Sequence, residues 1–203
     1  MSAATDLVEA DALTPEELGA VRAIYDDAFP EELRAPFDDL LVDRMLVLLD
    51  EDGPAGFALV RDLDGTLWTF LRYYAVGRRG RGTGSSMWRL LVDRLAADGR
   101  TRLIWDVEDP DEERLSPELV EEHRRRIVFY ERLGGRLQPV RDYLPPHDDG
   151  HAPQLLLMDT PLADEPDPPL RELVETVYLR RYGVPADHDV VRRTLLASRL
   201  LQP

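Results

Sequence analysis

Residues 79–84 read Arg-Gly-Arg-Gly-Thr-Gly and stand between an apolar run that ends at Val76 and an amphipathic segment that begins near Ser85. Glycine at every second position lets the backbone curl so that several N–H groups point inward. A helix N-terminus behind that curl adds partial positive charge. Three arginines within 78–81 add full charges, and 66–92 contains no acidic residue. The pattern predicts a phosphate or pyrophosphate cradle; the alternative is a glycine-rich turn with solvated arginines.

The spacing of the glycines excludes two well-known phosphate loops. A Walker loop needs a lysine after its last glycine, and this chain contains no lysine. A dinucleotide fingerprint, G-x-G-x-x-G/A, fails whether it is started at Gly80 or at Gly82, because neither start has glycine or alanine at its last position. The pattern [QR]-x-x-G-x-[GA] does fit, at Arg79, Gly82 and Gly84.

Hydrophobic patterning divides most of the chain into strands and helices. Apolar runs predict strands at 7–12, 45–49, 55–60, 67–76, 102–107 and 155–158. Helical spacing and end signals predict helices that begin at Pro15 and at Ser116, and others at 37–44, 85–97, 170–182 and 187–201. Asp-Gly turns make the early strands an antiparallel meander, and the helix that follows implies a βαβ unit with parallel pairing. The expected fold class is α/β, with an α+β mixed sheet.

Composition excludes several classes of function. The net charge of −15 opposes nonspecific nucleic-acid binding, which needs a positive surface. No apolar run approaches transmembrane length, the N-terminus lacks a signal-peptide pattern, and there is no cysteine. His147 and His151 are four residues apart, but the prolines, aspartates and glycine around them favour a loop. We therefore expect no nucleic-acid, membrane or metal partner and a cytoplasmic location.

A second motif follows the phosphate cradle in the chain. Residues 129–135 read Phe-Tyr-Glu-Arg-Leu-Gly-Gly. Together with the cradle, this segment resembles the GNAT acetyltransferase superfamily, whose core closes on F-Y-x-x-x-G-F. Asp106-Val107 matches the place where many members carry Glu-Val, and the segment Tyr143-Leu144-Pro145 before the last strand resembles the family's final hairpin.

The resemblance covers roughly residues 5–160. It implies a GNAT-like fold, in which an antiparallel meander is followed by a βαβ unit with splayed parallel strands. Three departures stand out: only two residues separate Val76 from Arg79, an acidic insertion occupies 109–113, and Gly135 replaces the usual aromatic residue. The last two affect the acceptor side, where family members differ most.

The resemblance further implies an N-acetyltransferase with acetyl-CoA as donor, in which a primary amine of a small molecule or peptide attacks the thioester in a ternary complex. Tyr130 would be the general acid, and either Asp106 or Glu108 the base, acting directly or through water. The residues implied in coenzyme A binding are Tyr74, Ala75, Val76, Arg79, Gly80, Arg81, Gly82, Thr83, Gly84, Ser85 and Ser86. Ordinary roles remain open for the three catalytic candidates, as a core aromatic and as partners in salt bridges or helix caps.

The acceptor and the end of the chain are less constrained. An acidic N-terminal region favours a cationic acceptor. Prolines within 161–169 predict a linker, so we expect a GNAT-like domain at 1–160 and a two-helix extension at 161–203. The apolar stripes of that extension would pack on the domain's own sheet, cover the acceptor cleft or form a homodimer contact. A non-catalytic coenzyme A-binding or interaction module is the alternative function.

Overall fold

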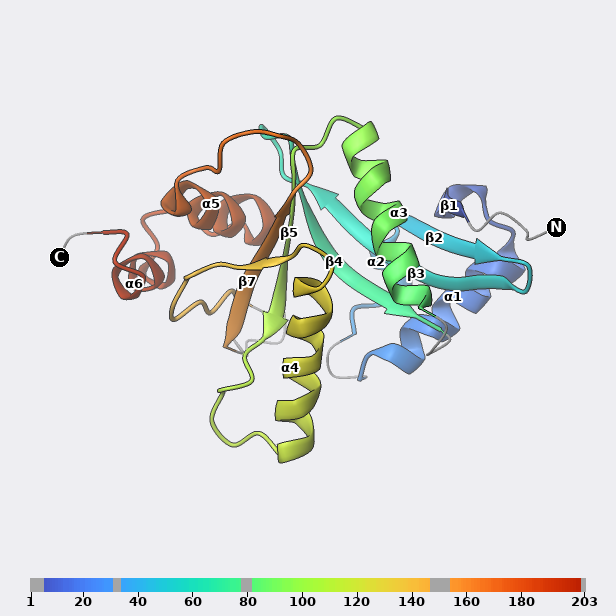
Figure 1. Ribbon diagram of the computed structural model, residues 1–203, viewed down its shortest axis with the longest axis horizontal. Helices are drawn as coiled ribbons and strands as arrows, with labels where there is room; N and C mark the ends of the chain where they lie inside the picture. The colour runs from blue at the N-terminus through green and yellow to red at the C-terminus, as the bar shows by residue number, and fades with distance from the viewer. Residues whose placement is uncertain (1–5, 31–33, 78–81, 147–153, 202–203) are drawn as a thin grey trace. The chain divides into compact units, whose positions relative to one another are not determined.

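The computed structural model describes residues 6–30, 34–77, 82–146 and 154–201 (Figure 1). Its strands are β1 (Asp6–Glu9), β2 (Arg44–Asp50), β3 (Gly53–Asp62), β4 (Trp68–Val76), β5 (Arg102–Glu108), β6 (Arg136–Leu137) and β7 (Leu155–Pro161). Its helices are η1 (Ala10–Ala12), α1 (Pro15–Ala28), α2 (Phe37–Leu40), α3 (Thr83–Ala97), α4 (Pro117–Glu131), α5 (Leu170–Thr176), η3 (Val177–Arg181) and α6 (Asp189–Ala197). The strands follow the order β1-β2-β3-β4-β5-β7-β6 in one seven-stranded sheet, so the predicted α/β fold class is confirmed.

The chain divides into two compact units. The first comprises Met1–Arg61 with Leu71–Gly99, and the second comprises Asp62–Phe70 with Arg100–Pro203. This division does not test the predicted boundary at residue 160, which stays a prediction. No helix in the described ranges is long and apolar enough to cross a membrane.

In the first unit, helices cover both faces of the antiparallel strands. Helix α1 begins with a complete capping box: Glu17 N–H donates to Thr14 Oγ1 at 3.3 Å, and Thr14 N–H donates to Glu17 Oε2 at 2.8 Å. Its Val21 and Tyr25 pack with Phe57 on one face. Because side chains alternate along a strand, Gly56 belongs to the other face, where a Cβ would lie 3.0 Å from Met87 Sδ of α3.

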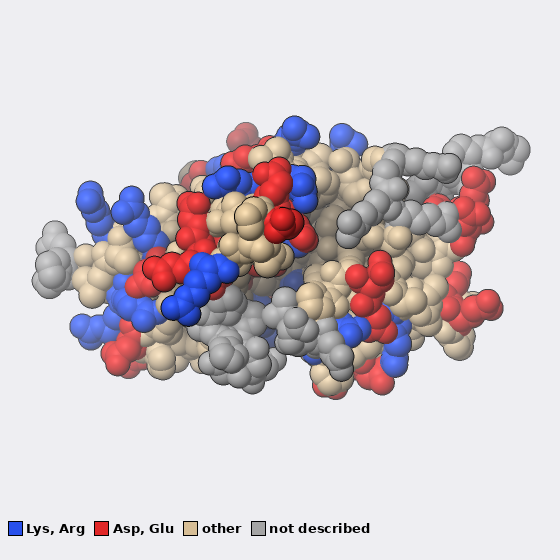
Figure 2. All heavy atoms as spheres, turned by 90° about the horizontal axis from the view of Figure 1, so that it is seen from below, with Lys and Arg blue, Asp and Glu red and all other residues tan. Residues whose placement is uncertain are grey.

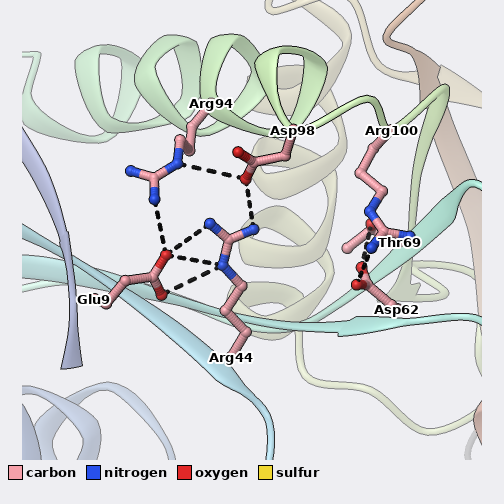
Figure 3. Close-up of polar contacts among 7 residues, drawn as sticks. All are labelled: Glu9, Arg44, Asp62, Thr69, Arg94, Asp98 and Arg100. Atoms are coloured by element: carbon pink, nitrogen blue, oxygen red, sulfur yellow. Dashed lines mark hydrogen bonds and ion pairs between the residues drawn. The ribbon is translucent and has the colours of Figure 1, made fainter. Parts of the chain in front are cut away.

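An ion-pair network fixes α3 to the edge of the first unit (Figure 3). The Arg44 guanidinium on β2 pairs with Glu9 of β1 at 2.6 Å and with Asp98 after α3 at 2.7 Å. Arg94 of α3 completes the network by pairing with Glu9 at 3.0 Å and with Asp98 at 3.4 Å. The network therefore joins two strands to the helix whose N-terminus follows the glycine-rich segment.

In the second unit, β5 and β7 pair antiparallel, with Asp106 opposite Leu157. One face of these strands is covered by the C-terminal helices, whose Leu173, Val174 and Val177 pack with Ile104 of β5. The apolar stripe is thus buried largely within its own unit, which is the first of the three predicted alternatives. Further members of this core are Leu63, Phe70, Val140, Tyr143, Leu155, Leu157, Tyr178, Val184, Val191 and Leu195.

A buried carboxylate anchors the segment that leads into these helices. Asp159 of β7, fully buried, accepts hydrogen bonds from Arg102 of β5 and from Arg136 at 2.9 Å. Both arginines also bind Asp167, at 2.7 Å and 2.8 Å respectively. The proline-rich segment is therefore held by charge to the strands it leaves.

Several element bounds differ from the predicted ones for local reasons. The first strand ends at Glu9, because Ala10–Ala12 forms a 3-10 turn. The helix expected at 37–44 spans only Phe37–Leu40, since β2 already begins at Arg44. The helix expected at 170–182 is α-helical only to Thr176 and continues as a π-helix over Val177–Arg181.

Candidate active site

The described part of the predicted phosphate cradle is the start of α3. Gly82 is the N-cap of this helix and has φ +75°, a left-handed conformation that favours glycine. Within the described chain no side chain caps this end, and its first turn carries no acidic residue. The first-turn N–H groups and the helix dipole therefore favour an anion here. Arg79, Gly80 and Arg81 lie outside the described residues.

Tyr74 links the end of β4 to the first turn of α3. Its hydroxyl donates to the Gly84 carbonyl oxygen at 2.5 Å, and its ring packs edge-on against Trp88 at 5.7 Å. The next residue, Ala75, is buried, and Val76 is half-buried. The expected strand bulge at 74–76, with N–H groups that hold the acyl carbonyl, stays a prediction. The predicted binding residues Thr83, Gly84, Ser85 and Ser86 form the first turn itself.

Asp106 of β5 lies on the side of the strand that faces the C-terminal helices. Its Oδ2 accepts a hydrogen bond from the Tyr182 hydroxyl, while Oδ1 is shielded from solvent and has no hydrogen bond among the described residues. Tyr143 is fully buried beside the same carboxylate, although its hydroxyl makes no hydrogen bond of standard geometry in the described chain. The Arg181 guanidinium stacks on the Tyr182 ring, 4.7 Å from its centroid.

Burial raises the pKa of the Asp106 carboxyl to about 6. The hydrogen bond from Tyr182, the Tyr143 phenol and the Arg181 charge lower this pKa, and nearby Glu108 raises it. A carboxyl group with a pKa just below neutrality is mostly ionised at pH 7 and is still basic enough to accept a proton. Its environment therefore suits a general base.

Glu108, the last residue of β5, lies in a different environment. Its carboxylate pairs with Arg126 of α4, which also contacts Glu122 at 3.2 Å. Burial raises the pKa of Glu108, but the Arg126 charge and hydrogen bond outweigh it, so that the pKa is lowered. A carboxylate held by a guanidinium is a weak proton acceptor. The structure thus distinguishes two candidates that the sequence left equal.

Tyr130 lies near the end of α4 and is buried. Its ring packs against Trp105 of β5 at 5.0 Å and against Phe129 at 5.1 Å. Burial raises the pKa of its phenol, and the Arg126 charge offsets only part of this effect. The phenol is therefore fully protonated at neutral pH, and its raised pKa makes it a weaker proton donor than an exposed tyrosine.

The unusual glycine after α4 has a steric reason. A Cβ at Gly135 would lie 2.9 Å from Trp105 Cζ2 and 2.9 Å from the Tyr130 carbonyl oxygen. That carbonyl also accepts the Gly135 N–H at 2.9 Å. The indole of Trp105 therefore leaves no room for a side chain at position 135, where the resemblance leads one to expect an aromatic residue.

The two proposed proton-transfer residues belong to opposite faces of β5. Trp105 and Asp106 are successive residues, so their side chains point to opposite faces. The Trp105 ring contacts Tyr130, whereas Asp106 binds Tyr182. One face thus presents a protonated phenol, and the other presents a carboxylate.

Sequence reasoning missed the part that the C-terminal helices play at Asp106. Tyr182 and Asp106 are 76 residues apart, and no local pattern links them. The only signal was that Tyr182 ends a predicted amphipathic helix. In the described ranges no three histidine or acidic side chains gather as a metal site. His147 and His151 lie outside those ranges.

Comparisons with known proteins agree with this architecture. The family model of the acetyltransferase (GNAT) family matches residues 15–117, just over half of the chain. No curated protein matches the sequence. A solved structure of a GNAT-family protein from Bacteroides thetaiotaomicron is similar with a TM-score of 0.66 at 21% identity, covering 88% of this chain and 98% of that one.

Two further solved structures carry more specific descriptions. The ribosomal-protein-S18-alanine N-acetyltransferase of Escherichia coli has a TM-score of 0.56 at 19% identity, covering 81% of this chain and 97% of its own. A phosphinothricin acetyltransferase of Sinorhizobium meliloti, solved in complex with acetyl-CoA, has a TM-score of 0.56 at 20% identity, covering 81% and 93%. At these identities the likeness concerns the fold. The family match covers half of the sequence, and the chain accordingly belongs to the acetyltransferase (GNAT) family and is an acyltransferase.

Proposed function

We propose that this protein transfers an acetyl group from acetyl-CoA to a primary amine of a small molecule or peptide, by direct attack in a ternary complex. The proposal is supported most by Asp106, a half-buried carboxyl group with Oδ1 shielded from solvent, whose pKa is raised to about 6. At pH 7 such a group is about ten to one ionised. It can therefore take the proton that the amine loses as its nitrogen attacks the thioester carbonyl.

The other candidate residues complete the proposed reaction. Tyr130, whose phenol is protonated at neutral pH, would donate its proton to the departing thiolate of coenzyme A. The N-terminus of α3, from Gly82 to Ser86, would hold the pyrophosphate together with Arg79. Glu108 would keep Arg126 in place and take no part in proton transfer.

A thiol-release assay with acetyl-CoA tests the reaction directly. The chain has no cysteine, so a thiol reagent reports only released coenzyme A. We expect Asp106→Asn to lower the rate by about 10² to 10⁴-fold, whereas Glu108→Gln, the matched control, retains most of the rate. If no amine in the panel gives thiol release although coenzyme A binds tightly, the non-catalytic alternative is favoured.

The acceptor panel should contain cationic, neutral and peptide amines. Figure 2 shows acidic and basic side chains interspersed on the face drawn. Two acidic residues of the N-terminal region are paired with arginine, Asp38 with Arg22 at 2.5 Å and Asp26 with Arg34 at 2.6 Å. A cationic acceptor therefore stays a prediction, as do the cytoplasmic location and a homodimer. Comparing longer acyl-CoA donors in the same assay defines the acyl group.

Two further variants test the donor side. Tyr130→Phe should lower turnover more than the affinity for acetyl-CoA, and unchanged turnover would remove Tyr130 as the acid. Gly82→Leu should abolish coenzyme A binding in calorimetry, because position 82 has a positive φ and faces the proposed pyrophosphate. Gly53→Leu is the matched control, since Gly53 also has a positive φ, of +102°, and open space around it. Normal affinity in Gly82→Leu would refute the phosphate cradle.

A further inference from the structure

Tyr182, the residue that follows the π-helix near the end of the chain, contacts Asp106 of β5 through its side chain. Val177–Arg181 forms a π-helix, and Tyr182 follows as its C-cap residue. The Tyr182 hydroxyl donates to Asp106 Oδ2 across 76 residues of sequence. π-Helical turns are rare and frequently occur at functional sites. The contact between Tyr182 and Asp106 thus lies at a kind of helical turn that is frequent at functional sites.

Packing fixes Tyr182 in the orientation that this hydrogen bond requires. Its ring contacts Phe70 of β4 edge-on at 6.1 Å, and the Arg181 guanidinium covers it at 4.7 Å. Arg181 also lies 5.4 Å from the Phe70 ring centroid. Tyr182 is thus held from two sides, so its hydroxyl has little freedom to leave the carboxylate.

The hydrogen bond makes the two oxygens of Asp106 different. Oδ2 accepts the Tyr182 hydroxyl, whereas Oδ1 makes no hydrogen bond of standard geometry with a described residue, although the buried Tyr143 hydroxyl lies near the carboxylate. A carboxylate held through one oxygen has a fixed plane, and its other oxygen keeps its lone pairs for an incoming proton. Holding a catalytic group in one geometry lowers the cost of reaching the transition state.

We propose that Tyr182 is a positioning residue for acyl transfer, which orients the Asp106 carboxylate so that the C-terminal helices form part of the active site. This inference rests on the proposed function, because it takes Asp106 as the base. It adds to that function a role for the C-terminal helices.

The groups that face Asp106 set the expected direction of the effect. Tyr182 and Tyr143 act through their hydroxyls and Arg181 through its charge, and all three lower the pKa of Asp106, while Glu108 on the same strand raises it. Leu157, opposite Asp106 on β7, contributes no charge. Removing the Tyr182 hydroxyl therefore raises the pKa of the carboxyl group. A hydrogen bond to a charged group corresponds to a shift of about one to two units.

The test is a carbon-13 NMR titration of the Asp106 carboxyl in the full chain, which needs neither donor nor acceptor. We expect Tyr182→Phe to move the titration midpoint up by about one to two pH units. Tyr178→Phe is the matched control: it removes a buried hydroxyl of the same π-helix that bonds Thr194 at 2.9 Å and makes no hydrogen bond with Asp106. Tyr182→3-fluorotyrosine keeps the fold and strengthens the donor, so it should move the midpoint down.

Kinetics then connect this titration to the reaction. With the acceptor found in the panel, the acidic limb of kcat/KM should move with the NMR midpoint in Tyr182→Phe. The rate above that limb should fall by about tenfold while KM for acetyl-CoA stays the same. An unmoved midpoint refutes the positioning role, even where Asp106→Asn abolishes activity and the proposed function stands. A moved midpoint with an unmoved limb refutes Asp106 as the base, and with it the positioning role in acyl transfer, while acetyl transfer itself stands.

Discussion

Asp106→Asn should make this protein more stable at neutral pH while it removes the proposed base. Asp106 is half-buried beside the C-terminal helices, with Oδ1 shielded from solvent, and desolvation raises the pKa of its carboxyl group from 3.8 to about 6. Asparagine has nearly the same shape and no charge to desolvate. Its carbonyl oxygen can still accept the hydrogen bond from Tyr182, and its amide can donate to the Tyr143 hydroxyl.

The size and sign follow from the pKa shift. A folded-state pKa above the unfolded one means that the group's stabilising contribution is complete below about pH 4 and is lost as pH rises through 6. A shift of about two units at about 1.4 kcal/mol each predicts that the wild type is about 3 kcal/mol less stable at pH 7.5 than the neutral variant. For a chain of this length this gain corresponds to a rise in Tm of about 6 to 12 °C.

The assay is urea denaturation of both proteins at pH 7.5 and at pH 4, with Glu108→Gln as the control. The gain of Asp106→Asn should shrink toward zero at pH 4, where the wild-type carboxyl is protonated. Glu108→Gln should have the opposite sign, because the lowered pKa of Glu108 stabilises the fold above its unfolded pKa and is lost as pH falls. Its cost should be about 0.5 to 1 kcal/mol, since the pair with Arg126 is partly exposed. Equal stability of Asp106→Asn and wild type at pH 7.5, or a gain that persists at pH 4, would refute the reasoning.

Two substitutions away from the proposed base test the packing of each unit. Gly56→Ala should destabilise the fold by about 1 to 3 kcal/mol in thermal denaturation, because its Cβ would lie 2.7 Å from the Ala75 carbonyl oxygen; Gly19→Ala, with open space inside α1, should be neutral or stabilising, and similar losses in both would contradict this account. Asp159→Asn should cost about 3 to 5 kcal/mol in urea denaturation, because it leaves the buried Arg102 without its full counter-charge; a loss below about 1 kcal/mol would show that the network contributes little.

Local signals predicted most of the fold. Thr14 with Glu17 and Ser116 before Pro117 each marked a helix start that the structure confirms, with side-chain caps in both cases. Such signals act within four residues and therefore survive in any tertiary context. The end of the tail helix was harder to place, because the change to a π-helix at Val177 depends on packing against the core.

The choice between the two candidate bases was beyond the sequence. Asp106 and Glu108 share a strand face by the period-two rule, so their pattern is the same. What separates them is the identity of their neighbours: Arg126, 18 residues away in the chain, for Glu108, and Tyr182, 76 residues away, for Asp106. Long-range contacts of this kind leave no periodic trace in a single sequence.

The acidic insertion at 109–113, one of the departures from the family pattern, has a structural role that its sequence does not show. The acidic insertion at 109–113 is a turn held by its buried first residue, whose carboxylate accepts hydrogen bonds from the Asp111 N–H at 2.8 Å and from the Gln154 side chain at 2.6 Å. Asp109 thereby connects the end of β5 to the residue before β7. The insertion consequently supports the strand that carries both candidate bases.

The two faces of β5 have different coverings, and the C-terminal helices cover the face that carries Asp106. On one face, Trp105 packs against Tyr130, which belongs to the segment that resembles the family's F-Y-x-x-x-G-F motif. On the other face, Asp106 would be an ordinary exposed carboxylate if nothing covered it, with a pKa near 3.8 and little basicity. The C-terminal helices supply both the burial that raises this pKa and the Tyr182 hydroxyl that limits the rise. If Asp106 is the base, its strength is therefore set by the C-terminal helices, and changes in these helices should tune the pH range of the reaction without altering the donor site.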